Sequence, residues 1–238
     1  MIKTIMFDLD GTLLPMEQSE FVKAYFGSLA KRLIPLGFEA EKLYEAIWAG
    51  VRSTVKNTSG KNNETVWWDT FTSYFGEIAE NAKQVLDDYY ENDFKKVQAS
   101  CGYDPRARDI VEALKARGYR LVLATNPIFP STATRQRIGW AGIDYKDFEL
   151  VTSYENCCRC KPNIEYYKNI LDTIGCKGEE CMMIGNDVDE DMIAEKLGIK
   201  VFLLTDHLLN KNDKDISAYR KGSFGELMEY ICELEVSD

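Results

Sequence analysis

Short apolar runs alternate with helical patterns along most of this 238-residue chain. Gly118, Gly175 and Gly198 each close a helical pattern just before such a run. Glycine is the usual residue just past a helix end, because it adopts a left-handed backbone conformation without strain. Strands that are apolar throughout and alternate with helices are typical of a parallel sheet covered by helices on both faces. We therefore predict an α/β fold whose strands include the apolar runs at 5–7, 121–124, 181–184 and 201–204.

The segment from residue 16 to residue 98 has a different pattern, with no convincing strand. Its apolar residues recur every three or four positions, as in amphipathic helices. One such stripe contains Phe21, Tyr25, Leu29 and Leu33, and another contains Leu43, Ile47, Val51 and Val55. We predict an inserted all-helical domain of about four helices over residues 16–98, with a polar loop at 57–63. Residues 1–15 and 99–238 would then form the α/β domain.

The charge and cysteine content narrow the class of protein. The formal net charge of −10 disfavours nucleic acid and anionic membranes as partners, because both bind basic surfaces. We expect no signal peptide before the first strand, and no apolar stretch approaches the roughly 18 residues of a membrane span. Seven unevenly spaced cysteines favour free thiols and a cytoplasmic protein. We expect a monomer or a homodimer.

Carboxylates are the best candidates for chemistry, because the chain has a single histidine, His207. That count nearly excludes a Ser–His couple or a histidine-rich metal site, and we expect no catalytic role for His207. Asp8 and Asp10 follow the apolar run 5–7 and precede a glycine, where a buried strand would end. Two carboxylates so close repel each other unless a cation or a shared proton offsets their charge. A hard cation such as Mg²⁺, which prefers oxygen ligands, meets that need.

Further polar residues follow the other predicted strands. Thr125 and Asn126 follow the run 121–124, and Asp187 follows the run 181–184. Lys161 lies in a loop before a helix that we expect to start near residue 163. Ligands of open parallel sheets bind outside the carboxyl ends of the strands. These residues are therefore expected to lie close to Asp8 and Asp10 at one edge of the sheet.

Taken together, these groups resemble the four sequence motifs of the haloacid dehalogenase-like (HAD) hydrolase superfamily, in the same order and with similar spacing. The resemblance spans essentially the whole chain, and the helical insertion after the first motif is similar to the C1 cap of phosphatases in that superfamily. It implies a Rossmann-like α/β domain with a helical cap that closes over the substrate. The motifs are Asp8-Leu9-Asp10-Gly11-Thr12, Thr125-Asn126, Lys161-Pro162 and Gly185-Asn186-Asp187-Val188-Asp189-Glu190-Asp191.

The resemblance implies a Mg²⁺-dependent phosphohydrolase that acts on a small phosphorylated metabolite. Asp8 would be the nucleophile that forms an aspartyl-phosphate, and Asp10 the general acid and later the base. Mg²⁺ would be held by Asp8, Asp187 and the backbone carbonyl of Asp10. An acid at position 10 favours phosphate chemistry, since dehalogenase members of the superfamily typically lack it.

The remaining motif residues would bind the phosphoryl group or support the site. Thr125, through its hydroxyl, and Asn126, through its backbone N–H, would hold phosphoryl oxygens, while Lys161 would neutralise carboxylate and phosphate together. Asp191 would orient Lys161 or a metal-bound water. Two alternatives stay open: a phosphomutase of the same superfamily, with the same site residues, and a non-catalytic protein that binds a phosphorylated ligand.

Several nearby residues have a plainer interpretation. Asp187 is also a good helix N-cap, and we expect Asp189 and Glu190 to be ordinary helix-opening acids. The spacing of Cys157, Cys158 and Cys160 is not that of a common zinc site, so we expect ordinary thiols rather than a metal or redox centre. Trp67 and Trp68 are expected to pack within the helical insertion, although one could face the substrate. The segment 127–130 is equally consistent with a rigid loop and with a pocket wall.

Overall fold

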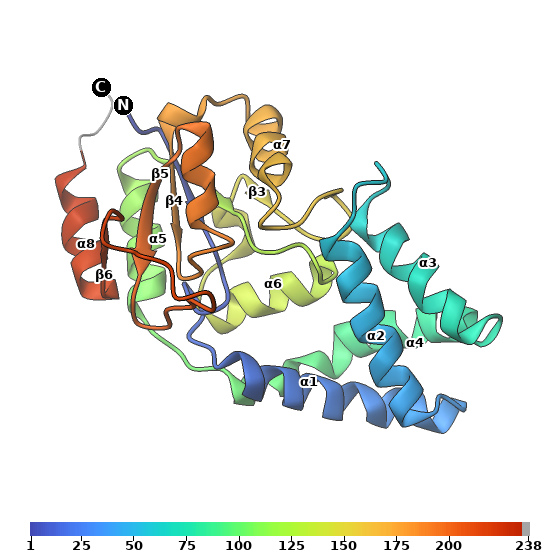
Figure 1. The fold of residues 1–238 in the computed structure, drawn as a ribbon. Helices are drawn as coiled ribbons and strands as arrows, with labels where there is room; N and C mark the ends of the chain where they lie inside the picture. Colours follow the sequence, from blue (N-terminus) through green and yellow to red (C-terminus); the bar gives the residue numbers. More distant parts are fainter. Residues whose placement is uncertain (235–238) are drawn as a thin grey trace.

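A six-stranded parallel sheet forms the centre of the computed structural model, which describes residues 1–234 (Figure 1). Its strand order is β3-β2-β1-β4-β5-β6, and every neighbouring pair is parallel. The strands are β1 (Thr4–Phe7), β2 (Arg120–Leu123), β3 (Leu150–Val151), β4 (Cys181–Gly185), β5 (Lys200–Leu204) and β6 (Lys221–Gly222). The predicted parallel α/β fold is confirmed. The chain leaves β1 toward β2 on one side and later returns to β4 on the other, so its topological switch point lies beside β1.

Alternate residues of each strand pack against helices on opposite faces of the sheet. Ile5 and Phe7 belong to the larger core cluster, which also holds apolar residues of α5 (Arg106–Ala116), α6 (Ser131–Trp140) and α8 (Phe224–Glu233). Met6 belongs to a second cluster with α7 (Ile164–Ile174) and η5 (Met192–Leu197). Successive side chains of a strand point to opposite faces, so helices on both faces explain why these strands are apolar at every position.

Two of the six strands are absent from the sequence prediction, and one helix has a different form. Strands β3 and β6 are only two residues long, which is too short to produce an apolar pattern. The helical pattern before Gly198 forms the 3-10 helix η5 instead of an α-helix. Gly118, Gly175 and Gly198 all have positive φ angles, as their predicted role at helix ends requires.

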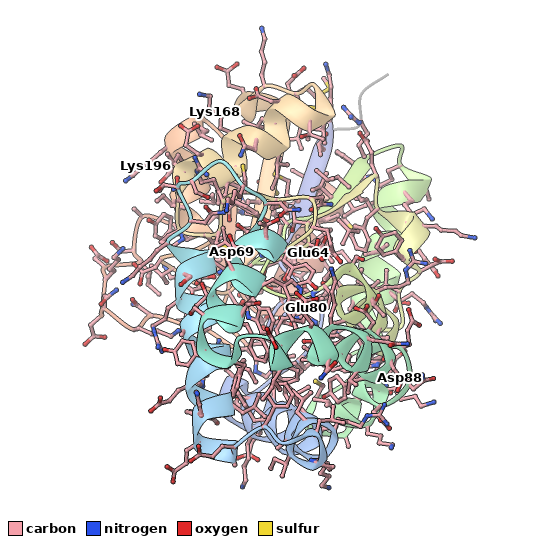
Figure 2. All side chains as sticks on the ribbon, turned by 90° about the vertical axis from the view of Figure 1, so that its right-hand side faces the viewer. Glu64, Asp69, Glu80, Asp88, Lys168 and Lys196 are labelled. Carbon is pink, nitrogen blue, oxygen red and sulfur yellow. The ribbon has the colours of Figure 1, made fainter. Side chains whose placement is uncertain are left out.

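A group of helices lies between β1 and β2 in the sequence, and we call it the helical insertion. It contains α1 (Gln18–Leu33), η1 (Ile34–Leu36), α2 (Ala40–Val55), α3 (Asn63–Phe75), α4 (Ile78–Asn92) and η2 (Phe94–Ser100). None of the strands within residues 1–234 falls in this segment. Figure 1 shows it beyond one end of the sheet, with α6 between it and the strands. Figure 2, viewed from that side, has α3 and α4 toward the viewer, with the labelled acids Asp69 and Glu80 on them.

Two asparagines at the ends of the predicted polar loop, Asn57 and Asn63, are buried against the α/β domain, while residues 58–61 of the loop are exposed. The backbone N–H of Asn63 donates to the carbonyl of Cys157 at 2.8 Å, and its side-chain amide donates to the carbonyl of Pro127 at 3.2 Å. Asn57 in turn donates to Oδ1 of Asn63 at 2.9 Å. Buried polar groups need such partners, so these asparagines fasten the helical insertion to the loop that leads to Lys161.

Within residues 1–234, no helix has both the length and the apolar character that crossing a membrane requires.

Candidate active site

Lys161 lies fully buried between two carboxylates at the carboxyl edge of the sheet. Its Nζ donates to Oδ1 of Asp8 at 2.8 Å and to Oδ1 of Asp191 at 2.6 Å. Burial lowers the pKa of the ammonium, but the charges of Asp191 and Asp8 outweigh burial, and the net pKa lies well above its usual value. Lys161 is therefore a permanent cation at the point where β1 and β4 end.

Asp191 is held in place from its other side by the backbone. Its Oδ2 accepts a hydrogen bond from the N–H of Asp187 at 3.0 Å, so one carboxylate bridges the fourth motif and Lys161. Gly185 makes room for it, because a Cβ at that position would lie 2.1 Å from Asp191 Oδ2. Burial raises the pKa of Asp191, and the neighbouring Lys161 opposes that shift.

The turn after β1 brings Asp8 and Asp10 to the same edge. Gly11 is required there, since its φ is +83° and a Cβ would lie 2.4 Å from Nδ2 of Asn186. Asn186 receives a hydrogen bond from the hydroxyl of Thr12 at 3.1 Å, which ties the turn to the end of β4. The Oδ2 atom of Asp8 has only a 3.5 Å contact with the Thr12 hydroxyl. One oxygen of Asp8 is thus engaged by Lys161, and the other is loosely held.

Asp10 pairs with an arginine that is not among the residues predicted from the sequence. The guanidinium of Arg137, on α6, donates a hydrogen bond to Oδ2 of Asp10, while Oδ1 of Asp10 is buried without a partner. Arg137 also stacks on the ring of Phe129, with its Cζ 4.6 Å from the ring centroid. Burial raises the pKa of Asp10, and the charge of Arg137 works against this rise. No motif marks Arg137 in the sequence, because a single arginine in a helical segment has no distinctive spacing.

The fourth motif contributes two further acids. Oδ1 of Asp187 accepts the N–H groups of Asp189 and Glu190 at 2.8 and 3.0 Å, so Asp187 does cap this turn, and it also lines the cavity described below. Glu190 differs from the expectation of an ordinary helix-opening acid. Its Oε2 accepts a hydrogen bond from Nδ2 of Asn126 at 2.9 Å, and burial raises its pKa to about 7. Asp189 pairs with Lys214 away from these groups, as expected of a surface acid.

A cavity of about 800 Å³ joins these groups to the helical insertion. All the site residues predicted from the sequence line it except Lys161, which is fully buried behind the carboxylates at the floor of the cavity. Both tryptophans of α3, Trp67 and Trp68, line it as well, and so do Ile128, Phe129 and Pro130, which makes that segment a pocket wall. The predicted site residues that line it are Asp8, Asp10, Thr125, Asn126, Asp187 and Asp191, and Asn186 and Glu190 of the fourth motif line it too.

The oxygen atoms at the cavity floor suit a hard divalent cation. Asp8 and Asp187 both line the cavity. Oδ1 of Asp10 is buried there without a hydrogen-bond donor, so the floor has more oxygen acceptors than donors to pair with them. These donors are all oxygen, which is the preference of Mg²⁺ rather than of zinc. Within residues 1–234, no three His, Cys, Asp or Glu side chains are grouped so that they alone could hold a metal ion. A bound Mg²⁺ would thus need a backbone carbonyl or a ligand oxygen besides the carboxylates.

Two of the three clustered cysteines, Cys157 and Cys160, lie in surroundings that disfavour a thiolate. All seven cysteines of the chain are free thiols. Burial raises the pKa of Cys157 to about 12 and also raises that of Cys160, which suppresses the reactive thiolate. Cys160 accepts a hydrogen bond from the amide of Asn63, so it helps to fasten the helical insertion.

Comparison with known proteins places this chain in a family. Residues 2–198 match the family model described as haloacid dehalogenase-like hydrolase. A glyceraldehyde 3-phosphate phosphatase of Methanocaldococcus jannaschii is 28% identical over 237 residues, which is 99% of each chain. A phosphoglycolate phosphatase of Aliivibrio fischeri is 26% identical over 205 residues, covering 86% of this chain and 84% of that protein.

A solved structure shares the fold. The crystal structure of a HAD phosphatase from Thermococcus onnurineus superimposes with a TM-score of 0.61. The alignment covers 99% of this chain and 100% of the other, at 17% sequence identity. At that identity the likeness concerns the fold, and it extends over both the sheet and the helical insertion.

Proposed function

This chain belongs to the haloacid dehalogenase-like hydrolase family and is a phosphatase of that family. We propose that it hydrolyses a phosphomonoester with Mg²⁺ and that the reaction passes through an aspartyl-phosphate on Asp8. One observation carries the proposal. The carboxylate of Asp8 lies at the floor of a cavity with one oxygen bonded to the buried ammonium of Lys161 and the other loosely held. A carboxylate oriented beside a fixed cation is what attack on phosphorus requires.

The first step forms a bond between Asp8 and phosphorus while the bond from phosphorus to the leaving oxygen breaks. Asp10 donates its proton to that leaving oxygen, so an alcohol departs. Burial raises the pKa of Asp10, which favours the protonated form that this step needs. A carboxylic acid at this position supports phosphoryl transfer rather than dehalogenation.

In the second step, water attacks the phosphorus of the aspartyl-phosphate and Asp10 takes a proton from that water. Asp8 is then released as the carboxylate, together with inorganic phosphate. We propose that Thr125 and the Asn126 N–H hold phosphoryl oxygens, since both residues line the cavity next to Asp8. Asp191 holds Lys161 in position through their 2.6 Å contact.

We propose that Asp8, Asp187 and the backbone carbonyl of Asp10 hold Mg²⁺. When bound, the ion supplies positive charge that offsets the carboxylates and the transferring phosphoryl group.

We propose that the helical insertion acts as a cap domain over residues 16–98, because its helices form the far wall of the cavity. Seven free cysteines fit a reducing compartment, so we place the enzyme in the cytoplasm.

The test is release of inorganic phosphate from a panel of phosphomonoesters that includes glyceraldehyde 3-phosphate and phosphoglycolate. Activity should require Mg²⁺, disappear with a chelator and return when Mg²⁺ is restored. Asp8→Asn should abolish it, whereas Asp189→Asn, a surface acid of the fourth motif, should not. Phosphate release by Asp8→Asn at the parental rate would contradict the proposal, and conversion of a sugar phosphate into its isomer would indicate a phosphomutase instead.

A further inference from the structure

The cavity extends well beyond the space that a phosphoryl group needs. It reaches from Asp8 and Asp10 at the floor to residues of all four α-helices of the helical insertion. A volume of about 800 Å³ lies near the upper end of the range for small-molecule sites. The leaving group of the substrate, rather than its phosphate, must account for most of this space.

The walls of that space are mainly aromatic and aliphatic. Val22 and Phe26 of α1 and Trp48 and Val51 of α2 line it, and each is only half-buried. Part of their apolar surface lines the cavity, so an apolar ligand bound there would remove that part from water at a gain of about 25 cal/mol per Å². In the sequence, the stripe that contains Val51 shows only the periodicity of an amphipathic helix, whereas in the structure this residue belongs to the cavity wall.

The charges on the wall disfavour an anionic leaving group. Among the described residues that line the cavity, Lys211 is the only lysine or arginine. Glu17, Asp87 and Asp206 also line it, so acids outnumber cations away from the phosphoryl position. The buried cations Lys161 and Arg137 are already paired with Asp8, Asp191 and Asp10. A carboxylate or a second phosphate on a leaving group that lies against α1 and α2 would find no cation among the residues of these helices that line the cavity.

From these observations we infer that the natural substrate is a phosphomonoester of an uncharged, largely apolar alcohol, with an aryl or extended alkyl group that lies against α1 and α2. This inference rests on the proposed phosphatase function and specifies its substrate class. It differs from the chemistry of phosphoglycolate, whose leaving group carries a carboxylate.

The inference is tested with matched esters and the intact protein plus Mg²⁺. Hexyl phosphate and 5-carboxypentyl phosphate have leaving alcohols of similar length and reactivity but different charge, and glycerol 3-phosphate is small and polar. We expect kcat/KM for hexyl phosphate to exceed the values for both other esters at least tenfold. A smaller ratio, with phosphate still released, would overturn the inference and leave the proposed function intact. No release from any ester in the panel would overturn both.

A charge placed on the wall gives a second readout. Val51→Lys should lower kcat/KM for hexyl phosphate and raise it for 5-carboxypentyl phosphate, so that the ratio between the two falls at least tenfold. Ile78→Lys is the matched control, because Ile78 is 45% exposed on α4 and does not line the cavity. An unchanged ratio in a folded Val51→Lys protein would refute the assignment of this wall. If that variant does not fold, Val22→Lys on α1 is measured in the same way.

Discussion

Arg137 donates a hydrogen bond to Asp10 from a position 127 residues further along the chain. The arginine is 1% exposed, so its charge is taken from water and its guanidinium needs the hydrogen bond that the Asp10 carboxyl group accepts. Its guanidinium also reaches the Thr134 hydroxyl at 3.3 Å and stacks on Phe129. Asp10, the acid proposed to protonate the leaving group, is therefore held in position by α6, a helix that lies outside all four motifs.

Replacing Arg137 by Met should misplace Asp10 and reduce kcat about 100-fold, because small displacements of a catalytic group are costly. Arg137→Lys keeps the charge and should recover part of that loss, which a purely structural role would not explain. Arg135→Met is the control, since Arg135 is exposed on the same helix and contacts the Tyr145 ring. Steady-state kinetics checks the prediction, and equal kcat in the Met and parental proteins would contradict it.

Lys161→Met should leave two buried carboxylates without their cation. Breaking a buried ion pair by removing one partner costs about 3–5 kcal/mol, so we expect a loss of that size in the free energy of unfolding, together with loss of activity. Lys168→Met, on the outer surface of α7 (Figure 2), should change stability by less than about 0.5 kcal/mol. Denaturant unfolding of both variants measures the difference, and similar midpoints would argue against the proposed charge balance.

Asn63→Ala should loosen the helical insertion from the α/β domain. The substitution leaves the Asn57 amide and the Pro127 carbonyl without one partner each, and an unsatisfied buried polar group costs about 1–3 kcal/mol. We expect a loss of about 2–4 kcal/mol, whereas Asn92→Ala, whose side chain bonds only to the exposed Asp88, should have little effect. Thermal unfolding provides the comparison, and hydrogen exchange of residues 57–64 should rise in Asn63→Ala alone.

The pair between Arg120 and Glu149 predicts a small dependence of stability on pH. The hydrogen bond from Arg120 lowers the pKa of Glu149 below its usual value. The ionised form is therefore the stabilising one, and its contribution is present above a pH of about 4.3 and is lost as the pH falls through the folded-state pKa. Because both side chains are about 40% exposed, we expect Glu149→Gln to cost only about 0.5 kcal/mol at pH 7. That difference, measured by denaturant unfolding, should vanish once the pH lies below the folded-state pKa of Glu149, and Glu229→Gln on α8 serves as the control.

The sequence by itself determined the parallel α/β fold, the helical insertion and the convergence of the four motifs. Each of these depends on local information. Glycines with positive φ end helices, apolar runs form buried strands, and residues after parallel strands meet at one edge. Strands β3 and β6 could not be predicted in this way, because a strand of two residues contains too little pattern.

Only the tertiary structure decided the pairing of Arg137 with Asp10, the place of Glu190 beside Asn126 and the apolar wall built by α1 and α2. Each depends on how separate elements pack together, and no spacing along the chain encodes it. A half-buried Val51 that faces a cavity has the same helical periodicity as one buried in a core. The difference lies in what packs opposite to it, which is a property of the folded chain alone.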